Sequence, residues 1–514
     1  MPNHLFALMR DRMPANDRTF IETPAVGGGV SRTLTYGDAL TLSSRMANLL
    51  VERGVQPGDR VAVQLEKSAE AIVLYLACVR AGAVYLPLNT AYTLAELDYF
   101  LGDAEPRVVV CSPGAKAELE PLARSKGVAA IETLGTDGTG SLMDGATACP
   151  SEFSDVERGP DDLAAILYTS GTTGRSKGAM LSHANLASNA VTLAEVWGFT
   201  AEDALLHALP IFHTHGLFVA TNVTLMAGSS LIFVSRFDAG EMLRLMPRAT
   251  VMMGVPTFYV RLLQHEGLTS AAVAHMRLFV SGSAPLLAET HDAWAERTGH
   301  RILERYGMTE TNMNTSNPYD GDRIAGTVGQ PLPGVTIRVT DPDSGEPLPD
   351  GEIGMIEVSG PNVFKGYWRM PEKTAAEFRG DGFFISGDLG KIDPRGYVHI
   401  VGRGKDLVIT GGYNVYPKEV EVEIDALPGV IESAVIGVPH ADFGEGVTAL
   451  VVRQPNATID EPAILKALDG RLAKYKQPKR VLFVEELPRN TMGKVQKNLL
   501  RDANKDLYAR AKAG

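Results

Sequence analysis

Cysteine is scarce in this chain of 514 residues, which contains only Cys78, Cys111 and Cys149. None of them has a second cysteine three positions away, so the sequence predicts neither a Cys-x-x-Cys metal site nor a disulfide framework. Inert thiols in a reducing cytosol are the expected state, which favours a cytoplasmic location. Residues 1–17 lack an apolar core followed by a small-residue cleavage site, so no signal peptide is predicted.

Positive charge is not in excess, because the formal net charge is −12. A chain of this sign is not built to coat nucleic acid or an anionic membrane, and we expect neither as a partner. The exception is residues 471–514, where 12 lysines and arginines stand against 4 acidic residues. This stretch is either a solvated helical tail or a basic surface that meets phosphate groups.

One long segment has no charge of either sign, since residues 204–235 contain no Lys, Arg, Asp or Glu. Pro210, Asn222 and the run Gly228-Ser229-Ser230 interrupt its apolar character. The pattern favours a strand, a buried helix over about 216–226 and a second strand rather than a membrane span.

Short apolar strands alternate with helices over the first part of the chain. Helices are predicted over 38–54 and 69–82, and strands over 60–65, 107–111, 164–170, 230–234, 250–254 and 277–283. This alternation is typical of an α/β fold with parallel sheets. Glycine-rich segments between residues 351 and 415 then indicate hairpins.

The pattern changes again after Gly412. We predict a helix over 418–427, strands over 432–438 and 448–453, a helix over 463–475 and a strand over 480–487. This is a small α+β unit, and its junction with the preceding part is expected within 401–407. The predicted architecture is a large N-terminal domain of layered sheets and helices, residues 1–403, and a small α+β domain, residues 404–514.

A loop of sequence YTSGTTGRSKG occupies residues 168–178, directly after a predicted strand. Gly171 and Gly174 are three positions apart and Lys177 follows three further on, whereas the P-loop has its lysine directly after the second glycine. Hydroxyls, backbone N–H groups and a lysine can surround an anion. We therefore predict a phosphate-binding loop rather than a flexible surface turn.

Further motifs follow in the order ERYGMTE at 304–310, GYW at 366–368, SGDLG at 386–390, VGRGKDLVITGG at 401–412 and PRNTMGKVQK at 488–497. With the loop, they resemble the signature of the adenylate-forming superfamily, which holds acyl-CoA synthetases, luciferases and adenylation modules. The resemblance spans nearly the whole chain. It implies ATP, Mg²⁺ and coenzyme A, and a first reaction in which a carboxylate attacks the α-phosphate of ATP to give an acyl-adenylate and diphosphate.

The resemblance also implies which residues bind ATP and Mg²⁺. Phosphate contacts are implied for Thr169, Ser170, Gly171, Thr172, Thr173, Gly174, Lys177 and Thr309. Adenine and ribose contacts are implied for Ser283, Ala284, Pro285, Asp388 and Arg403, and further contacts with ATP for Glu304, Tyr306, Gly307, Met308 and Lys494. Glu310 would hold Mg²⁺, a cation that prefers carboxylate and phosphate oxygens. Taken alone, Thr309-Glu310 could equally be a helix-capping pair.

Lys494 matches the catalytic lysine of the family. A cation between the attacking carboxylate and the phosphate would offset charge that builds in the transition state, worth roughly 2.7–4 kcal/mol. The resemblance places a hinge at Lys405, about which the small, mobile domain would rotate and bring Gly411 and Gly412 to the pantetheine arm of coenzyme A. Acetylation of Lys494 by a lysine acetyltransferase would remove its charge and is predicted to stop adenylation.

Charged and polar residues are predicted to line the acid pocket, whereas fatty and aryl acids need apolar walls. Arg261 lies in GVPTFYVR, Arg305 opens RYGMTE, and Ser283 and His213 are expected beside them. A guanidinium group binds a carboxylate through two hydrogen bonds. A surface ion pair is an equal alternative for either arginine alone, but the set favours an acid with a second carboxylate.

These segments resemble the malonyl-CoA synthetases of the family, in which the matching Arg, Ser and Arg grip the free carboxylate of malonate. Thr214 and Met313 would bound the space at C2. The implied activity is formation of malonyl-CoA, AMP and diphosphate, with methylmalonate as a weaker substrate and a loss of at least roughly tenfold when either arginine is removed.

Three alternatives stay open at this point. One is an adenylation enzyme that loads a carrier protein, and another is a CoA ligase for a different short-chain acid. The third is a non-catalytic nucleotide-binding regulator, against which the presence of Lys494, Glu310 and Asp388 argues.

Overall fold

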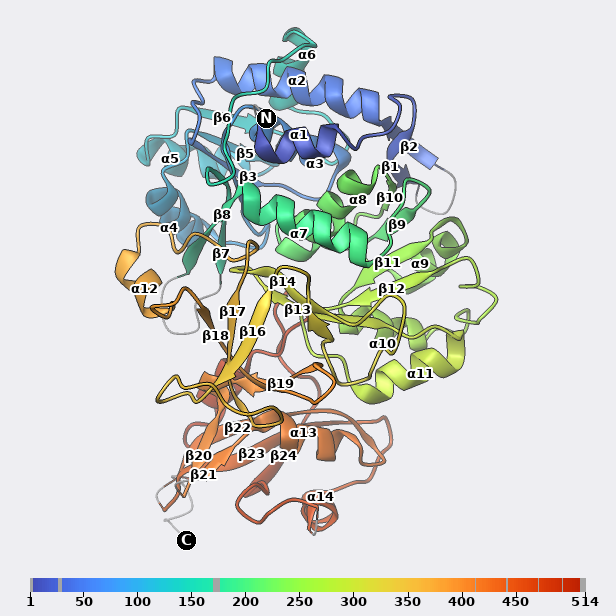
Figure 1. Ribbon diagram of the computed structural model, residues 1–514, viewed down its shortest axis with the longest axis vertical. Coiled ribbons are helices and arrows are strands. Elements are labelled where there is room, and N and C mark those ends of the chain that lie inside the picture. Colours follow the sequence, from blue (N-terminus) through green and yellow to red (C-terminus); the bar gives the residue numbers. More distant parts are fainter. Residues whose placement is uncertain are drawn as a thin grey trace.

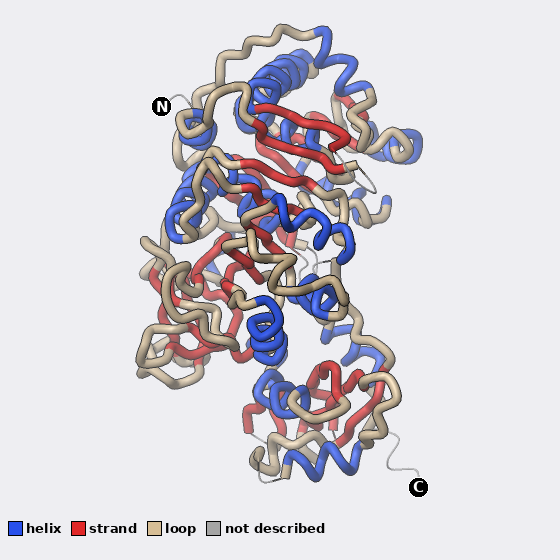
Figure 2. The backbone as a smooth tube through the Cα atoms, turned by 90° about the vertical axis from the view of Figure 1, so that its right-hand side faces the viewer, coloured by secondary structure: helices blue, strands red, loops and turns tan. Residues whose placement is uncertain are grey.

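The computed structural model describes residues 3–25, 30–169, 176–411, 413–440, 442–469, 471–491 and 493–508. A large α/β part is followed by a smaller α+β part, which lies at one end of the molecule (Figures 1 and 2). This confirms the predicted fold class.

Two predominantly parallel sheets form the large part. The first has the strand order β15 (Gln330–Pro331), β14 (Asn312–Ser316), β13 (Leu303–Met308), β12 (Leu278–Ser281), β11 (Val251–Gly254), β9 (Ala204–His207), β10 (Ser230–Phe233), β1 (Thr19–Pro24) and β2 (Val30–Thr35). The second has the order β6 (Ala130–Thr133), β5 (Val108–Cys111), β3 (Arg60–Gln64), β4 (Val84–Pro87), β7 (Leu163–Thr169) and β8 (Lys177–Ser182). Antiparallel strands occur only at the edges of these described sheets.

Two further sheets complete the described fold. Strands β16 (Thr336–Thr340), β17 (Gly354–Ser359), β18 (Phe384–Ile392) and β19 (Val398–Arg403) form an antiparallel sheet. The C-terminal sheet contains β20 (Val408–Thr410), β21 (Tyr413–Val415), β22 (Val430–His440), β23 (Gly444–Arg453) and β24 (Arg480–Val484). The chain therefore passes from the third sheet to the fourth through the short 3₁₀ helix η3 (Gly404–Asp406).

Helices cover these sheets on both sides (Figure 1). They are α1 (His4–Arg10), α2 (Tyr36–Glu52), α3 (Ala69–Arg80), α4 (Leu94–Ala104), α5 (Lys116–Ser125), α6 (Ser141–Ala148), α7 (His183–Val196), η1 (His215–Thr221), α8 (Asn222–Ala227), α9 (Ala239–Leu245), η2 (Met246–Arg248), α10 (Pro256–Leu263), α11 (Ala288–Thr298), α12 (Pro371–Ala376), α13 (Pro417–Asp425), α14 (Glu461–Leu468) and α15 (Lys497–Asn504). Among them, η1 is a π-helix.

Capping residues explain where the predicted helices begin. Thr35 and Asp38 form a capping box at the start of α2, and the hydroxyl of Ser68 caps α3. The buried helix predicted over 216–226 is confirmed as η1 followed by α8. The helix predicted over 463–475 is too long, because Asp469 leaves the helical conformation with ψ 128° and α14 ends at Leu468.

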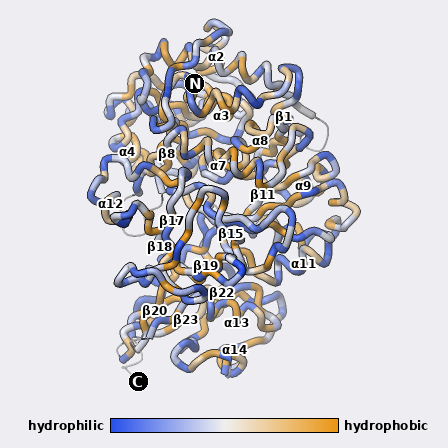
Figure 3. The backbone as a smooth tube through the Cα atoms, in the orientation of Figure 1, coloured by the Kyte–Doolittle hydropathy of each residue, from blue (hydrophilic) through white to orange (hydrophobic). Residues whose placement is uncertain are grey.

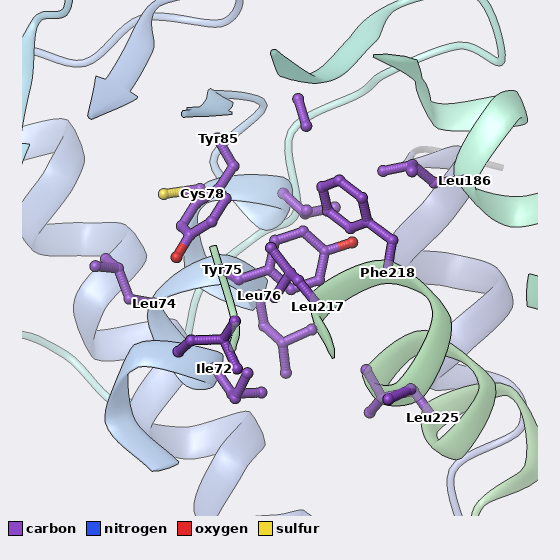
Figure 4. Packing of buried hydrophobic residues seen from close by; sticks show 14 of the residues in the cluster. Ile72, Leu74, Tyr75, Leu76, Cys78, Tyr85, Leu186, Leu217, Phe218 and Leu225 are labelled. Atoms are coloured by element: carbon purple, nitrogen blue, oxygen red, sulfur yellow. The ribbon is translucent and has the colours of Figure 1, made fainter. Parts of the chain in front are cut away.

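Apolar side chains gather between the layers, and the backbone is most hydrophobic along the central strands and helices such as α3 and α8 (Figure 3). In α3, every residue is buried, Tyr75 packs beside Leu217 and Phe218 of η1, and Cys78 lies beside Tyr85 (Figure 4). The three cysteines are buried and unpaired. No helix in the described ranges has the length and apolarity needed to cross a membrane.

Candidate active site

The turn predicted to lie along adenine follows β12 directly. Strand β12 pairs in parallel with the neighbouring strand β13. Ser283 in this turn has a left-handed backbone, with φ 72°. Non-glycine residues seldom adopt this conformation, and where it occurs it clusters at functional sites. Ala284 and the exposed Pro285 follow. Carboxyl ends of parallel strands are where ligands bind in α/β sheets.

Arg305 lies within β13 and is only 3% exposed. A Cβ atom at Gly282 would lie 2.3 Å from Arg305 Cζ, so only glycine leaves room for the guanidinium group. Its buried Nε and Nη2 atoms have no hydrogen-bond partner among the described residues. Burial lowers the pKa of Arg305 to about 9. Since buried charges are normally paired, this group is suited to bind an anionic ligand.

Two histidines lie beside this guanidinium group. His215 Nδ1 is 3.2 Å from Ser283 Oγ, and the main-chain N–H of His215 donates to His213 Nδ1 at 3.3 Å. Burial, and then the charge of Arg305, lowers the pKa of His213 to about 4 and lowers that of His215 well below its usual value. Both rings are therefore neutral near pH 7 and offer hydrogen bonds without adding charge.

Thr214 and Met313, predicted to bound the C2 position, are both buried. The hydroxyl of Thr214 has no hydrogen-bond partner in the described part of the chain. Met313 lies in β14, which contacts η1, and its Cε would be 2.6 Å from a Cβ atom at Gly307. The carbonyl oxygen of Asn312 would be closer still, at 1.8 Å, so Gly307 cannot carry a side chain here.

Arg261 requires a correction, because its side chain is exposed rather than part of a buried pair. It occupies the last turn of α10, whose core face is made by Tyr259 and Leu262. Residues four apart share a helix face, so Arg261 lies one turn from Thr257. Thr257 in turn contacts Gly493, where a Cβ atom would be 3.3 Å away. Arg261 therefore shares the face of α10 that meets the C-terminal loop.

The predicted phosphate-binding lysine has an acidic partner that the sequence did not reveal. Lys177 Nζ is 3.0 Å from Glu377 Oε1 and lies 4.0 Å from the ring centre of Tyr367. The Tyr367 hydroxyl is 2.5 Å from Glu377 Oε2 and 3.0 Å from Glu310 Oε1. One tyrosine thus connects the lysine of the phosphate loop with the predicted metal ligand. Thr309 and Glu310 form the turn between β13 and β14, so the helix-capping alternative is wrong.

Glu310 fits the role of a Mg²⁺ ligand. Its carboxylate is buried, which raises its pKa, and the main-chain N–H of Phe364 donates to its carbonyl oxygen at 2.8 Å. The described residues contain no group of three His, Cys, Asp or Glu arranged around one metal position. Mg²⁺ commonly binds to one or two carboxylates together with substrate phosphates and water, so a single carboxylate is an adequate protein contribution.

The predicted ribose-binding residues lie together between β13 and the third sheet. Asp388 is buried, accepts from the Tyr306 hydroxyl at 2.5 Å and is paired with Arg403 at 2.8 Å. Arg403 ends β19 and pairs with Asp388 in the strand register. Glu304 is also buried, and burial raises its pKa to about 8. Met308 ends β13 and packs against the main core cluster.

The loop that carries Lys494 reaches the large part of the molecule. Asn89 donates to the hydroxyl of Thr491 at 3.5 Å, and Gly493, with φ 74°, lies against Thr257. Burial, and then Arg403, lowers the pKa of Lys494, whereas Asp388, Asp406 and Glu310 raise it. Lys494 is therefore within electrostatic reach of both the ribose-side and the metal-side carboxylates.

The predicted hinge residue, Lys405, lies in η3 between the third and fourth sheets. Partial burial, followed by the charge of Arg403, lowers its pKa to about 8. The next residue, Asp406, is paired with Arg501 of α15. Gly411 has φ 58°, and its N–H donates to the carbonyl oxygen of Phe443 at 2.8 Å. Gly412 lies outside the described residues.

Six residues of the predicted phosphate loop also lie outside the described ranges, namely Ser170, Gly171, Thr172, Thr173, Gly174 and Arg175. Thr169 ends β7, and its hydroxyl donates to the carbonyl oxygen of Lys177 at 3.5 Å. Two residues in contact with Lys177 were not predicted from the sequence. Tyr367 lies in the GYW motif, but no role was predicted for it. Glu377 follows α12 and carries no sequence signal of its own.

Fold and site together define an adenylate-forming enzyme. The AMP-binding enzyme family matches residues 13–368, and the AMP-binding enzyme C-terminal domain matches residues 419–494. The chain belongs to the AMP-binding enzyme family.

Among curated relatives, feruloyl-CoA synthase of an Amycolatopsis species is 39% identical over 91% of this chain and 93% of its own length. Mitochondrial malonate–CoA ligase of Mus musculus is 35% identical over 92% of this chain and 86% of its own.

Among solved structures, ATP-bound MatB from Rhodopseudomonas palustris is 66% identical and covers 99% of this chain and 100% of its own, with a TM-score of 0.96. The apo crystal structure of MatB, at the same identity and coverage, gives a TM-score of 0.85. Because the sequence identity is equal, the difference is one of conformation. The described arrangement is closer to that of the ATP-bound structure.

Proposed function

We propose that the protein is a malonate–CoA ligase. It would convert ATP, malonate and coenzyme A into malonyl-CoA, AMP and diphosphate through a malonyl-adenylate, with methylmalonate as a weaker substrate. The observation that carries the proposal is the buried guanidinium group of Arg305, which has two nitrogen atoms without a hydrogen-bond partner among the described residues. A carboxylate on the far end of the acid would pair with both.

The relatives alone do not choose the acid. A curated relative at 39% identity is named for a feruloyl product and one at 35% for malonate. These two identities are too similar to choose between the two acids. The site discriminates better, since an apolar aryl acid would leave the Arg305 guanidinium buried and unpaired. Sites built around a polar substrate group can reject analogues that lack it by about 10⁴–10⁵.

In the first step, a carboxylate oxygen of malonate attacks the α-phosphorus of ATP and diphosphate leaves. We assign Lys494 to this step, because its loop packs against the large part of the molecule at Asn89 and Thr257, and because, although burial lowers its pKa, the charges of Asp388 and Glu310 act to raise it. Its positive charge would offset the negative charge that builds on the transferred phosphate oxygens. Preorganised donors of this kind contribute roughly 2.7–4 kcal/mol each.

Glu310 would hold Mg²⁺, which neutralises phosphate charge when bound. Tyr367 orients this carboxylate through its hydroxyl, at 3.0 Å from Glu310 Oε1. Lys177 would turn from Glu377 toward the β- and γ-phosphates, since its ammonium group is held by a partly exposed ion pair rather than by a buried one. Asp388 would accept hydrogen bonds from the ribose hydroxyls, with Arg403 and Tyr306 holding it in place.

In the second step, the thiol sulfur of coenzyme A attacks the acyl carbon, loses its proton, and displaces AMP. We propose that residues 404–514 pivot at Lys405 and present the turn at Gly411. Beside this turn lie the exposed rings of Tyr413 and Phe443, with Lys479 Nζ 4.9 Å from the ring centre of Phe443. Aromatic faces with a nearby cation suit the adenine and phosphates of coenzyme A.

Acetylation of Lys494 is a proposed mode of control. The modification would remove the charge on which the first step depends, while leaving thioester formation from a preformed adenylate intact. Treating the enzyme with acetylating reagent until activity is lost and then mapping the modified lysines tests this. Inactivated enzyme with unmodified Lys494 would contradict it.

The experiment that tests the proposed function is a panel of acids with ATP, Mg²⁺ and free coenzyme A. Malonate, methylmalonate, succinate, acetate, propionate and ferulate would be compared by kcat/KM for thioester formation. We expect malonate to be best, methylmalonate next, and acetate, propionate and ferulate to be worse than malonate by at least about 10⁴, the lower end of the range for a site that loses a buried polar partner. Acetate or ferulate within about tenfold of malonate would overturn the diacid assignment.

The same panel separates the remaining alternatives. An enzyme that loads a carrier protein would exchange diphosphate into ATP with malonate but would form no thioester with free coenzyme A. A nucleotide-binding regulator would show neither activity with any acid. A CoA ligase for another short-chain acid would show the full reaction with a different member of the panel.

A further inference from the structure

A buried lysine lies at the junction between the two large sheets. Lys67 follows β3 of the six-stranded sheet, and its Nζ donates to the carbonyl oxygen of His207, the last residue of β9 in the nine-stranded sheet, at 2.7 Å. Lys67 is only 9% exposed, and its two described hydrogen bonds both go to His207. Burial lowers its pKa well below the usual value. A lysine held in this way is costly, and its contacts therefore call for a reason.

The second contact of Lys67 leads toward the acid side of the site. Its Nζ is 2.8 Å from His207 Nδ1, and His207 Nε2 is 2.8 Å from the carbonyl oxygen of Gly216 in η1. A carbonyl oxygen only accepts, so Nε2 must carry the proton. In the neutral ring Nδ1 is then the acceptor, and Lys67 is the donor. The chain of contacts thus has one consistent set of hydrogen positions.

The carbonyl oxygen of Gly216 is the point where this chain meets the π-helix. It also accepts from the Thr221 hydroxyl at 3.1 Å, so two side chains hold a single main-chain group. A Cβ atom at Gly216 would be 2.0 Å from the carbonyl oxygen of Pro210, so this position cannot carry a side chain. π-helices are rare and are frequently found at functional sites.

The residue before Gly216 is His215, which contacts Ser283 at 3.2 Å and lies beside Arg305. The π-helix packs on the other side against α3, where the rings of Tyr75 and Phe218 are 5.7 Å apart (Figure 4). The position of His215 is therefore set by contacts on both ends of one short helix. Lys67 and His207 make the polar part of those contacts and do not reach the acid site themselves.

We propose that Lys67 and His207 are positioning residues, which fix η1 and thereby hold His215 and Ser283 in the orientation that the acid requires. This inference rests on the proposed function, because it assigns these residues to the binding of malonate rather than of ATP. The matching contacts on the nucleotide side, such as Tyr306 to Asp388, involve neither residue.

The test compares three variants with a control in which another buried histidine is lost. Lys67→Met and His207→Phe break the chain at its two members, and Thr221→Val removes the second donor to Gly216 with little change in volume. His183→Phe is the control: His183 is 0% exposed and accepts from the main-chain N–H of Leu5 at 3.3 Å, at the start of α7. KM for malonate and for ATP, kcat and thermal stability are measured for all four.

We expect Lys67→Met and His207→Phe to raise KM for malonate by roughly fivefold to tenfold, which corresponds to one lost hydrogen bond. KM for ATP should stay within about twofold of the wild-type value, because the contacts on the nucleotide side involve neither residue. Thr221→Val should act in the same direction with a smaller increase. His183→Phe should change neither KM, even where its stability falls as much as that of His207→Phe.

The inference is overturned if folded variants keep the wild-type KM for malonate, or if KM for malonate and ATP rise together in all four proteins. Should Lys67→Met and His207→Phe not fold, Thr221→Val decides the question by the same criterion. A wild-type enzyme that uses a different acid would instead contradict the proposed function. The variants would then be measured with that acid, so that the two failures remain distinct.

Discussion

On the nucleotide side of the candidate site, Lys177, Glu310 and Asp388 each contact a partner within the protein, whereas Arg305 on the acid side has buried nitrogen atoms with none in the described part of the chain. A paired group must give up its partner when a ligand binds, and the exchange yields little net free energy. A buried cation without a partner gains the full pairing with an incoming anion. The comparison indicates that Arg305 contributes more to selection of the acid than any one of the paired residues contributes to nucleotide binding.

The strongest way to break this contrast is Arg305→Met, which replaces the guanidinium group by an apolar side chain. We expect kcat/KM for malonate to fall by roughly tenfold to 150-fold, the equivalent of about 1.5–3 kcal/mol for hydrogen bonds to a charged group. KM for ATP should change little. The midpoint of thermal unfolding should rise by a few degrees, because a buried unpaired charge has been removed.

Arg277→Met is the matched control for stability. Arg277 is paired with buried Asp203 at 2.6 Å, so its loss leaves a carboxylate buried and unpaired and should lower the midpoint of unfolding. Both variants remove one arginine, yet they should shift stability in opposite directions. A fall in stability for Arg305→Met would show that Arg305 has an internal partner and that the acid side is paired like the other.

Much of this arrangement could be predicted from the sequence, because the motifs fix residue types at strand ends. Arg305, Tyr306 and Glu310 were predicted from the ERYGMTE motif, although no strand was predicted there, and they lie on or next to β13. Strands β3, β5, β7, β10, β11 and β12 and the helices α2 and α3 were predicted from the alternation of apolar patterns. These are local signals, and the structure preserves them.

Contacts between distant segments could not be predicted. Glu377 reaches Lys177 across 200 positions, and Lys67 reaches His207 across 140, with no pattern in either neighbourhood. Arg261 shows a limit of local signals. Its motif predicted that the side chain of Arg261 lines the acid pocket. The rotation of α10 instead directs Tyr259 and Leu262 into the core, and the side chain of Arg261 is exposed. Helical phase over eight residues is too short a signal to fix which face meets the pocket.

A second variant, Tyr367→Phe, tests the paired side. It removes the hydroxyl that lies 3.0 Å from Glu310 and 2.5 Å from Glu377, and so leaves both carboxylates less constrained. We expect KM for ATP at fixed Mg²⁺ to rise by roughly twofold to tenfold, as for one hydrogen bond, with KM for malonate unchanged. Tyr36→Phe, which removes a buried hydroxyl bonded to Ser229 at 2.7 Å, is the control without a role in the cleft. Equal changes in both KM values would mean that the two sides are not independent.

The smallest effect is expected for Arg261→Ala, smaller than the roughly tenfold loss predicted from the sequence, because the side chain of Arg261 is exposed. If Arg261 contacts the acid only from the solvent-exposed edge of the site, its exposed charge contributes about 0.2–1 kcal/mol to binding of the acid. This corresponds to at most about fivefold in kcat/KM for malonate. The effect should diminish as salt rises, since exposed charges are screened, whereas the loss in Arg305→Met should persist. A loss for Arg261→Ala as large as that for Arg305→Met, and insensitive to salt, would require Arg261 to turn inward and become buried when the acid binds. The contrast between a single buried guanidinium group and an exposed one would then apply only to the ligand-free arrangement.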